Sequence, residues 1–256
     1  MSARGRIRIG TSGWSYDHWD QTFYPEGLDA EARLAFYARR FDTVEINNSF
    51  YRLPSAAQVA DWRAATGRDF VFAAKASRYI THMKKLREPR ESMARFFDRM
   101  DALGRNLGPL LFQLPPGWSY DGERLAAFLD ALPSDARCAM EFRDHSWLNE
   151  DARQRLREHG VAWCIYDLAG FTAPKEITAD FVYIRLHGPE DAYRGNYSAS
   201  ALSGWAGAIS SWARRGLDVF CYFDNDEKAC APGDAARLRD MLGAADGARS
   251  AEPGGE

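Results

Sequence analysis

Acidic, basic and imidazole side chains stand at the ends of several short apolar stretches of this sequence. Glu45 and Glu141 are carboxylates of the kind that flank a substrate as acid and base, or as nucleophile and acid. His187 is suited to shuttling protons near neutral pH. Lys75 could hold an anion by its charge or, when deprotonated, form a Schiff base, and nearby acids favour the charged form. These four residues are the candidate catalytic group.

Further polar and aromatic residues in the same regions are candidates for ligand binding. Arg143 and Arg185 would hold an anionic group of the ligand. Arg78 belongs to a basic loop that either contacts an anion or forms a solvated helix entry. Trp14 and Tyr51 could stack on a sugar ring or a base, or simply cap the core. The full predicted binding set is Asn47, Gln113, Arg143, Arg185, Asp224, Asn225, Arg78, Trp14 and Tyr51.

The acids and the histidine also allow a metal site as an alternative. Five residues could supply oxygen or nitrogen ligands to Mn²⁺, Mg²⁺ or Zn²⁺: Glu45, Glu141, Asp167, His187 and Asp224. However, no HxxxH or HExxH spacing is present, and Lys75 would already supply positive charge. We therefore predict neither a metal nor a cofactor.

A purely structural interpretation competes with the functional one. Buried ion pairs also perturb pKa values, so any single member of the group could serve as a satisfied salt bridge. A plug that served only stability could instead be built from apolar side chains at lower cost. The complete set of acids, bases and amides therefore favours a site.

The elements that must position these residues are short apolar runs that alternate with amphipathic stretches. The runs predict strands at residues 6–10, 43–47, 70–75, 110–113, 138–142, 161–166, 181–187 and 219–223. Apolar residues at steps of three and four predict helices at residues 30–40, 56–65, 92–107, 121–132, 150–159, 198–215 and 234–242. The segment 167–179 is too short and too broken by proline for a helix, which makes the sixth crossover irregular.

Strands that alternate with helices, without a break in composition, predict one α/β domain: a single (β/α)8 TIM-type barrel of parallel strands over residues 1–243. A doubly wound open sheet is the alternative, but the GTSG stretch after the first strand is neither GxGxxG nor a Walker loop. Residues 244–256 predict a flexible tail. In such a barrel, the carboxyl ends of the strands would bring the candidate residues to one mouth.

The composition is that of an ordinary soluble protein. The chain has 33 Lys and Arg against 36 Asp and Glu, a net charge of −3, which excludes a generally basic nucleic-acid coat. Its start lacks the apolar segment of a signal peptide, and no stretch approaches the ~18 apolar residues of a membrane span. Cys138, Cys164 and Cys221 lie in apolar runs, which is typical of buried thiols in a reducing compartment. We predict a cytoplasmic protein with no membrane partner.

A series of motifs in this order resembles the YecE-like family, a domain of unknown function. The motifs are GTSGWSY (10–16), FYP (23–25), TVEINNSFYR (43–52), FAAKASRYITH (72–82), LFQLPP (111–116), EFR (141–143), SW (146–147), YIRLHG (183–188) and YFDN (222–225). The resemblance implies a TIM-type barrel in a bacterial or archaeal cytoplasm, with no assigned substrate, cofactor or catalytic residue. Where relatives commonly read Asn-Asn, this chain has Asp224 and Asn225, which adds a carboxylate.

These observations predict an enzyme that uses acid/base chemistry on a small polar, phosphorylated or carbohydrate-like metabolite at the barrel mouth. The alternative is a non-catalytic binding protein for an anionic ligand such as a nucleotide or, less favoured, a nucleic acid. Ionic strength separates them, because phosphate-dominated binding weakens steeply with salt whereas binding of a neutral sugar does not.

Overall fold

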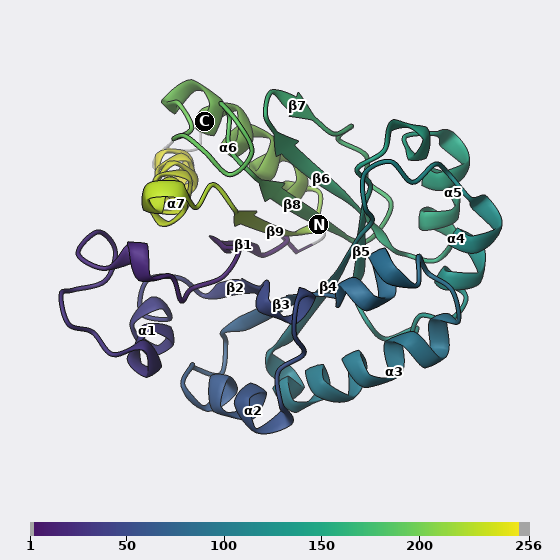
Figure 1. The fold of residues 1–256 in the computed structure, drawn as a ribbon. Coiled ribbons are helices and arrows are strands. Elements are labelled where there is room, and N and C mark those ends of the chain that lie inside the picture. Colours follow the sequence, from purple (N-terminus) through teal and green to yellow (C-terminus); the bar gives the residue numbers. More distant parts are fainter. Residues whose placement is uncertain (1–2, 251–256) are drawn as a thin grey trace.

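Eight parallel strands form a barrel in the computed structural model, which describes residues 3–250 (Figure 1). Neighbours pair in the order β1-β9-β8-β6-β5-β4-β3-β2. The strands are β1 (Ile7–Thr11), β2 (Thr43–Ile46), β3 (Val71–Lys75), β4 (Leu107–Gln113), β5 (Cys138–Glu141), β6 (Ala162–Leu168), β8 (Phe181–Leu186) and β9 (Asp218–Phe223). All eight predicted strands are present, and the predicted TIM-type barrel is confirmed.

Seven α-helices among residues 3–250 surround the barrel (Figure 1). They are α1 (Ala30–Tyr37), α2 (Ala56–Ala64), α3 (Pro89–Met100), α4 (Gly122–Leu129), α5 (Glu150–Glu158), α6 (Ala199–Arg214) and α7 (Cys230–Ser250). Between β6 and β8 the chain forms β7 (Phe171–Thr172), a short strand antiparallel to β6, in place of a helix. The predicted irregular sixth crossover is therefore confirmed.

Polar side chains set where several of these helices begin. Ser55 accepts a hydrogen bond from the amide of Gln58, whose side chain accepts one from the amide of Ser55, so α2 starts with a capping box. Asn149 and Ser198 accept from amides in the first turns of α5 and α6. Such caps fix the length of the loops that lead from the barrel mouth into the helices.

Few hydrogen bonds join β1 to β2, the two strands that close the barrel. The amide of Gly13 donates to the carbonyl of Glu45 at 2.8 Å. The buried hydroxyl of Tyr37, at the end of α1, accepts from the amide of Thr11 at 2.9 Å and donates to the carbonyl of Thr43 at 3.1 Å. A helix side chain thus satisfies strand groups that lack a ladder partner.

Substitution of Tyr37 by phenylalanine tests this closure. Tyr37→Phe leaves a buried amide and a buried carbonyl without their shared partner, which costs about 2–4 kcal/mol. For a domain of this size, this corresponds to a melting temperature lower by roughly 5–15 °C. Tyr120→Phe is the control, because the Tyr120 hydroxyl bonds to the exposed carboxylate of Asp151. Equal thermal shifts for the two variants would contradict this account of the closure.

Alternate residues of the strands face the inside of the barrel and form a core of their own. This interior core consists of Ala73, Leu111, Ala139, Ala162, Cys164, Phe181, Tyr183, Phe220 and Tyr222. A larger apolar core lies between the sheet and the helices. Because side chains alternate across a strand, the residue two positions beyond an interior residue also faces inward, nearer the carboxyl end.

Cysteine usage and the last helix test the remaining fold predictions. Cys138, Cys164 and Cys221 are buried free thiols, as predicted.

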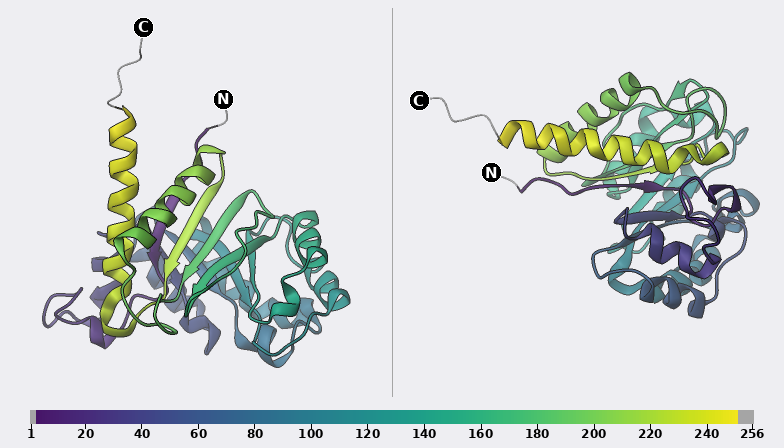
Figure 2. Two further views of the ribbon diagram at one scale, coloured as in Figure 1. Left: turned by 90° about the horizontal axis from the view of Figure 1, so that it is seen from above. Right: turned by 90° about the vertical axis from the view of Figure 1, so that its left-hand side faces the viewer.

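Helix α7 continues to Ser250 and reaches past the neighbouring strands beside β1 (Figure 2), so residues 244–250 of the predicted tail are helical. Residues 251–256 of that tail lie outside the described residues. None of the helices within residues 3–250 combines the length and apolar character needed to cross a membrane.

Candidate functional site

Five strands carry a polar residue two positions beyond a residue of the interior core. These pairs are Ala73 and Lys75, Leu111 and Gln113, Ala139 and Glu141, Tyr183 and Arg185, and Tyr222 and Asp224. Parallel strands place their carboxyl ends at the same end of the barrel, so the second member of each pair faces the mouth. The alternation of side chains along each strand thus points apolar residues into the barrel and places the polar candidate residues above them, at the mouth.

The guanidinium of Arg185 lies at the centre of this group and is fully buried. Its Nη2 donates to Glu45 Oε1 at 2.8 Å and to Asp224 Oδ2 at 3.0 Å. Its Nη1 donates to Glu141 Oε2 at 3.0 Å. One cation therefore bonds carboxylates from three other strands or strand ends. Buried charge is tolerated in this form because Arg185 and its three carboxylates are paired and hydrogen-bonded to one another.

Glu45, inside the barrel at β2, is surrounded by donors. Ser12 Oγ donates to its Oε1, and the Tyr183 hydroxyl donates to its Oε2 at 2.7 Å. Arg185 Nε adds a bond to Oε2 at 3.0 Å. With 0% of its surface exposed, Glu45 is placed to hold Arg185 in position.

Glu141, at the end of β5, has two arginine partners. Arg143 Nε donates to its Oε1, and Arg185 occupies Oε2. Burial alone would raise the pKa of Glu141, but Arg143 and Arg185 hold that pKa well below its usual value. Glu141 is therefore ionised at neutral pH.

His187 lies between the arginines and Asp224. Its Nε2 is 2.7 Å from Arg143 Nη2 and 3.2 Å from Arg185 Nη1. Guanidinium nitrogens only donate, so Nε2 accepts, and the contacts assign the proton of the neutral ring to Nδ1. Nδ1 lies 3.0 Å from Asp224 Oδ2, although not aligned for a hydrogen bond. Burial would raise the pKa of Asp224, but its cationic neighbours, Arg185 foremost, lower it.

Lys75, at the end of β3, differs from its neighbours because its amine is not paired. Within residues 3–250, its Nζ makes no ion pair and no hydrogen bond, and it lies 4.2 Å from the centroid of the Phe50 ring. Only 7% of the residue is exposed. Burial, followed by the positive charge of Arg185, lowers the pKa of Lys75 to about 8, against the opposing pull of Glu141 and Asp224.

The family model described as "Protein of unknown function DUF72" matches residues 8–255 of this chain. The chain belongs to the DUF72 family. The YecE-like family that the motifs predict is therefore confirmed, since the UPF0759 protein YecE of Escherichia coli K12 is 30% identical over 158 residues. That alignment covers 60% of this chain and 55% of YecE.

Two further relatives align over nearly their whole length. The UPF0759 protein YunF of Bacillus subtilis is 24% identical over 269 aligned residues, which cover 92% of this chain and 94% of YunF. A solved structure of a DUF72 family protein from Thermotoga maritima is similar with a TM-score of 0.84 and 27% identity. That comparison covers 93% of this chain and 99% of the other. The DUF72 relatives thus support the barrel and assign no reaction.

In this DUF72 chain, Glu45 and Glu141 flank the guanidinium of Arg185, and a direct contact of either with a ligand stays a prediction. Both carboxylates are fully buried and bond to Arg185. The sequence placed both at the mouth but could not show that one guanidinium would lie between them.

Three of the residues named as possible metal ligands, Glu45, Glu141 and Asp224, all bond to Arg185, whose guanidinium occupies the space between them. No group of three or more His, Cys, Asp and Glu side chains in the described part of the chain is arranged to hold an ion. Asp167 is engaged elsewhere, accepting from the Thr172 hydroxyl at 3.0 Å and from the Tyr197 hydroxyl at 3.2 Å.

The predicted amide ligands lie in different surroundings. Asn225 is fully buried and donates to the Gly195 carbonyl and to Asp234, both at 2.8 Å, which joins a loop to α7, while its Oδ1 has no hydrogen-bond partner in the described structure. Asn47 and Gln113 are half-buried. The Oδ1 atom of Asn47 is buried without a hydrogen-bond partner in the described structure, which leaves it an acceptor for a ligand or water.

The outer candidates differ in exposure. Trp14 is 8% exposed and packs edge-on against Trp62 at 5.1 Å, so it caps the core, the alternative that the sequence left open. Together with Tyr16 and Asn47 it also lines a hollow of about 110 Å³ above β1 and β2. Tyr51 is 71% exposed and Arg78 is exposed, so neither is part of the buried network.

Sequence reasoning missed three residues that complete the site. Ser12 and Tyr183 bond to Glu45, and the Tyr193 ring meets His187 edge-on at 5.5 Å. Ser12 and Tyr183 could have been found from the inward alternation of their strands, since Tyr183 lies two positions before Arg185. Tyr193 lies in a loop and left no such signal.

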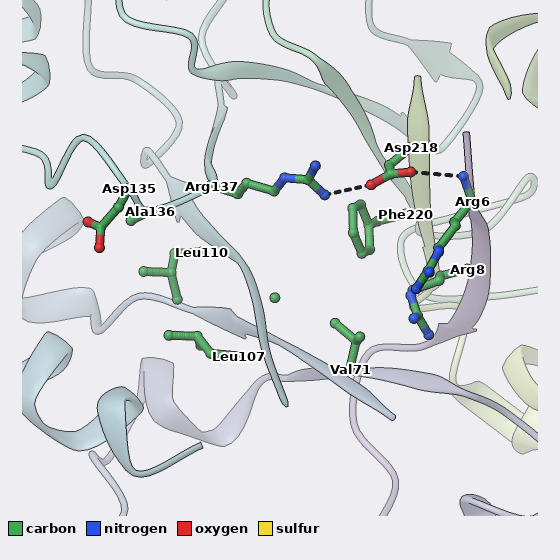
Figure 3. Close-up of a pocket in the computed structure, with 11 residues that line it drawn as sticks. Arg6, Arg8, Val71, Leu107, Leu110, Asp135, Ala136, Arg137, Asp218 and Phe220 are labelled. Atoms are coloured by element: carbon green, nitrogen blue, oxygen red, sulfur yellow. Dashed lines mark hydrogen bonds and ion pairs between the residues drawn. The ribbon is translucent and has the colours of Figure 1, made fainter. Parts of the chain in front are cut away.

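A second hollow, of about 370 Å³, lies at the opposite end of the barrel (Figure 3). Its arginines are bonded across strands. Arg137 donates to Asp218 at 2.7 Å, and Arg8 donates to Asp42 at 2.9 Å. The Phe220 ring and apolar strand starts line the rest (Figure 3). These bonds join strand ends at the amino-terminal face, where TIM barrels build stability rather than catalysis.

Proposed function

We propose that this DUF72 protein is an enzyme that binds a small polar or anionic metabolite at the barrel mouth and turns it over by proton transfer. Lys75 and Asp224 are the acid and the base. The observation that carries the proposal is the unpaired, nearly buried amine of Lys75 beside acids that are all bonded to arginine.

At neutral pH one of the two groups is deprotonated and the other is mostly protonated, as an acid/base pair requires. Asp224 has a lowered pKa and is ionised at neutral pH, so it serves as the base. Lys75, with a pKa of about 8, is mostly protonated at neutral pH and gives up its proton readily, so it serves as the acid. Each is among the groups whose charge shifts the pKa of the other, which supports their placement at one reaction centre.

The fully buried residues then have supporting roles. Glu45 and Glu141 hold Arg185, while His187 faces Asp224 with Nδ1 and the arginines with Nε2. Arg143, with 9% of its side chain exposed, is the cation available to a ligand's anionic group. The catalytic roles predicted for Glu45, Glu141 and His187 become positioning roles in this proposal.

A thermal-shift screen of carboxylate, phosphate and sugar metabolites tests the proposal. A ligand at about 100 times its Kd adds about 2.7 kcal/mol of stability, or roughly 5–10 °C in melting temperature. We expect such shifts in the wild type and in Arg137→Met, and their loss in Lys75→Met. Shifts in melting temperature that persist in Lys75→Met but disappear in Arg137→Met would place the ligand site at the amino-terminal face. A broad library that shifts the melting temperature of no variant would contradict the proposal.

Binding of a nucleotide or nucleic acid is the second candidate. Tyr51 and Tyr79 are exposed by 71% and 43%, and Arg78 is exposed next to Tyr79. Exposed aromatic and basic side chains of this kind stack on bases and contact phosphates. The basic loop is partly neutralised, however, because Lys84 pairs with Glu88. A steep fall of affinity with salt would favour this candidate.

A further inference from the structure

We infer that Lys75 forms a covalent imine with the carbonyl group of its substrate, which makes small aldehydes and oxo acids the substrate class. The inference rests on the proposed function, since it concerns the same mouth. It goes further because it assigns a bond between the protein and the substrate, in which Lys75 acts as the nucleophile instead of the acid.

The surroundings of the amine are those of a nucleophile rather than of a structural ion pair. Within the described residues, Nζ has no carboxylate partner, because Glu45, Glu141 and Asp224 all bond to Arg185. A lysine held as a counter-ion would instead bond to one of these acids. The centroid of the Phe50 ring lies 4.2 Å from Nζ, and a ring face does not engage the nitrogen lone pair of the neutral amine.

A low pKa makes the neutral form accessible. With a pKa of about 8, about one Lys75 side chain in ten is neutral at pH 7. An ordinary lysine near 10.4 is neutral in less than about one molecule in a thousand. Desolvation and an adjacent cation are the two devices by which lysine nucleophiles are activated, and burial and Arg185 supply both here.

Formation of the imine needs no reagent besides Lys75 and the carbonyl compound. The lone pair of Nζ attacks the carbonyl carbon, a C–N bond forms, and the carbonyl π electrons move to oxygen. The oxygen then leaves as water with the two protons of the neutral amine, which yields the neutral imine. Asp224 remains beside the new C=N bond as an ionised base, which supplies the proton transfer of the proposed function.

An anionic group on the substrate fits the charges at the rim. The side chain of Arg143 is 9% exposed, and its Nε and Nη2 are engaged by Glu141 and His187. Its Nη1 makes no hydrogen bond within residues 3–250 and is free to bind a carboxylate or phosphate. A small oxo acid, with a carbonyl for Lys75 and a carboxylate for Arg143, satisfies both groups.

Reductive trapping tests the inference directly. The full chain is incubated with glyoxylate or pyruvate and sodium cyanoborohydride, and peptide mass spectrometry locates the reduced adduct among the lysines at positions 75, 84, 85, 175 and 228. We expect labelling of Lys75 at least about tenfold above every other lysine, in keeping with its larger neutral fraction. Lys84→Arg should keep this selectivity, and Lys75→Arg should abolish it while circular dichroism stays unchanged.

Labelling spread evenly over the five lysines, or absent from Lys75, would overturn the inference. Thermal shifts with glycolate and lactate, the matching alcohols, separate this failure from failure of the proposed function. If these acids stabilise the wild type but not Lys75→Met while oxo acids leave Lys75 unlabelled, the mouth binds ligands without an imine. If neither binding nor labelling occurs, both proposals fail.

Discussion

Replacement of Arg185 by leucine is expected to remove most of the protein's stability at room temperature. The side chain bonds three carboxylates in the barrel interior, and the variant would leave Glu45, Glu141 and Asp224 buried without that cation. Breaking one buried pair by removing a single partner costs about 3–5 kcal/mol. Several such losses together approach the whole stability of a typical protein, about 5–15 kcal/mol.

Urea denaturation followed by circular dichroism at pH 5 and pH 8 measures this loss. The stranded carboxylates would have raised folded-state pKa values, so the variant should be less stable at pH 8 than at pH 5. Arg137→Leu is the matched control, because its partner Asp218 lies at the solvent-accessible amino-terminal face, where such a pair contributes about 0–1 kcal/mol. A loss in Arg185→Leu no larger than in Arg137→Leu would refute the central role of this cation.

Lys75→Met is expected to stabilise the protein while removing its reactivity. The folded-state pKa of Lys75 is about 8, against about 10.4 in the unfolded chain, so folding at neutral pH must bury an ammonium that prefers water. Methionine removes that cost at similar length, and we expect a gain on the order of 1–3 kcal/mol at pH 7. Melting temperatures should rise by about 2–10 °C.

The pH dependence of this gain has a definite sign. Below about pH 8, both states of the wild type hold the proton and the full penalty applies. Between about pH 8 and 10.4, the unfolded chain binds more protons than the folded one, so wild-type stability rises and the advantage of Lys75→Met shrinks. Lys84→Met, at an exposed ion pair, should show no gain. A Lys75→Met variant less stable than the wild type at pH 7 would contradict the buried-amine account.

The sequence was sufficient to predict the barrel and the position of its mouth. Apolar runs that each end in a polar residue identify the carboxyl ends of the strands, and the absence of a helix in 167–179 correctly marks the sixth crossover. These features follow from local periodicity, which a single sequence displays directly.

The contacts of each residue within the candidate site could not be predicted in the same way. Whether Glu45 faces a ligand or a guanidinium depends on how far Arg185 reaches across the barrel, a distance that no spacing in the chain encodes. The lowered pKa of Lys75 likewise depends on burial and on Arg185, whereas the sequence drew attention to neighbouring acids that favour its charged form. Both features arise from contacts between strands that are far apart in the sequence.

The Tyr37 hydroxyl has a consequence for how this protein could be altered. Where β8 meets β9, residues 181–186 pair in register with residues 218–223, and widening the barrel there would sacrifice a long ladder of amide bonds. Between β1 and β2, a single phenol carries much of the connection. Widening the barrel between β1 and β2, directly beside Glu45, therefore costs the least stability. Evolution or engineering could use this position to admit bulkier compounds.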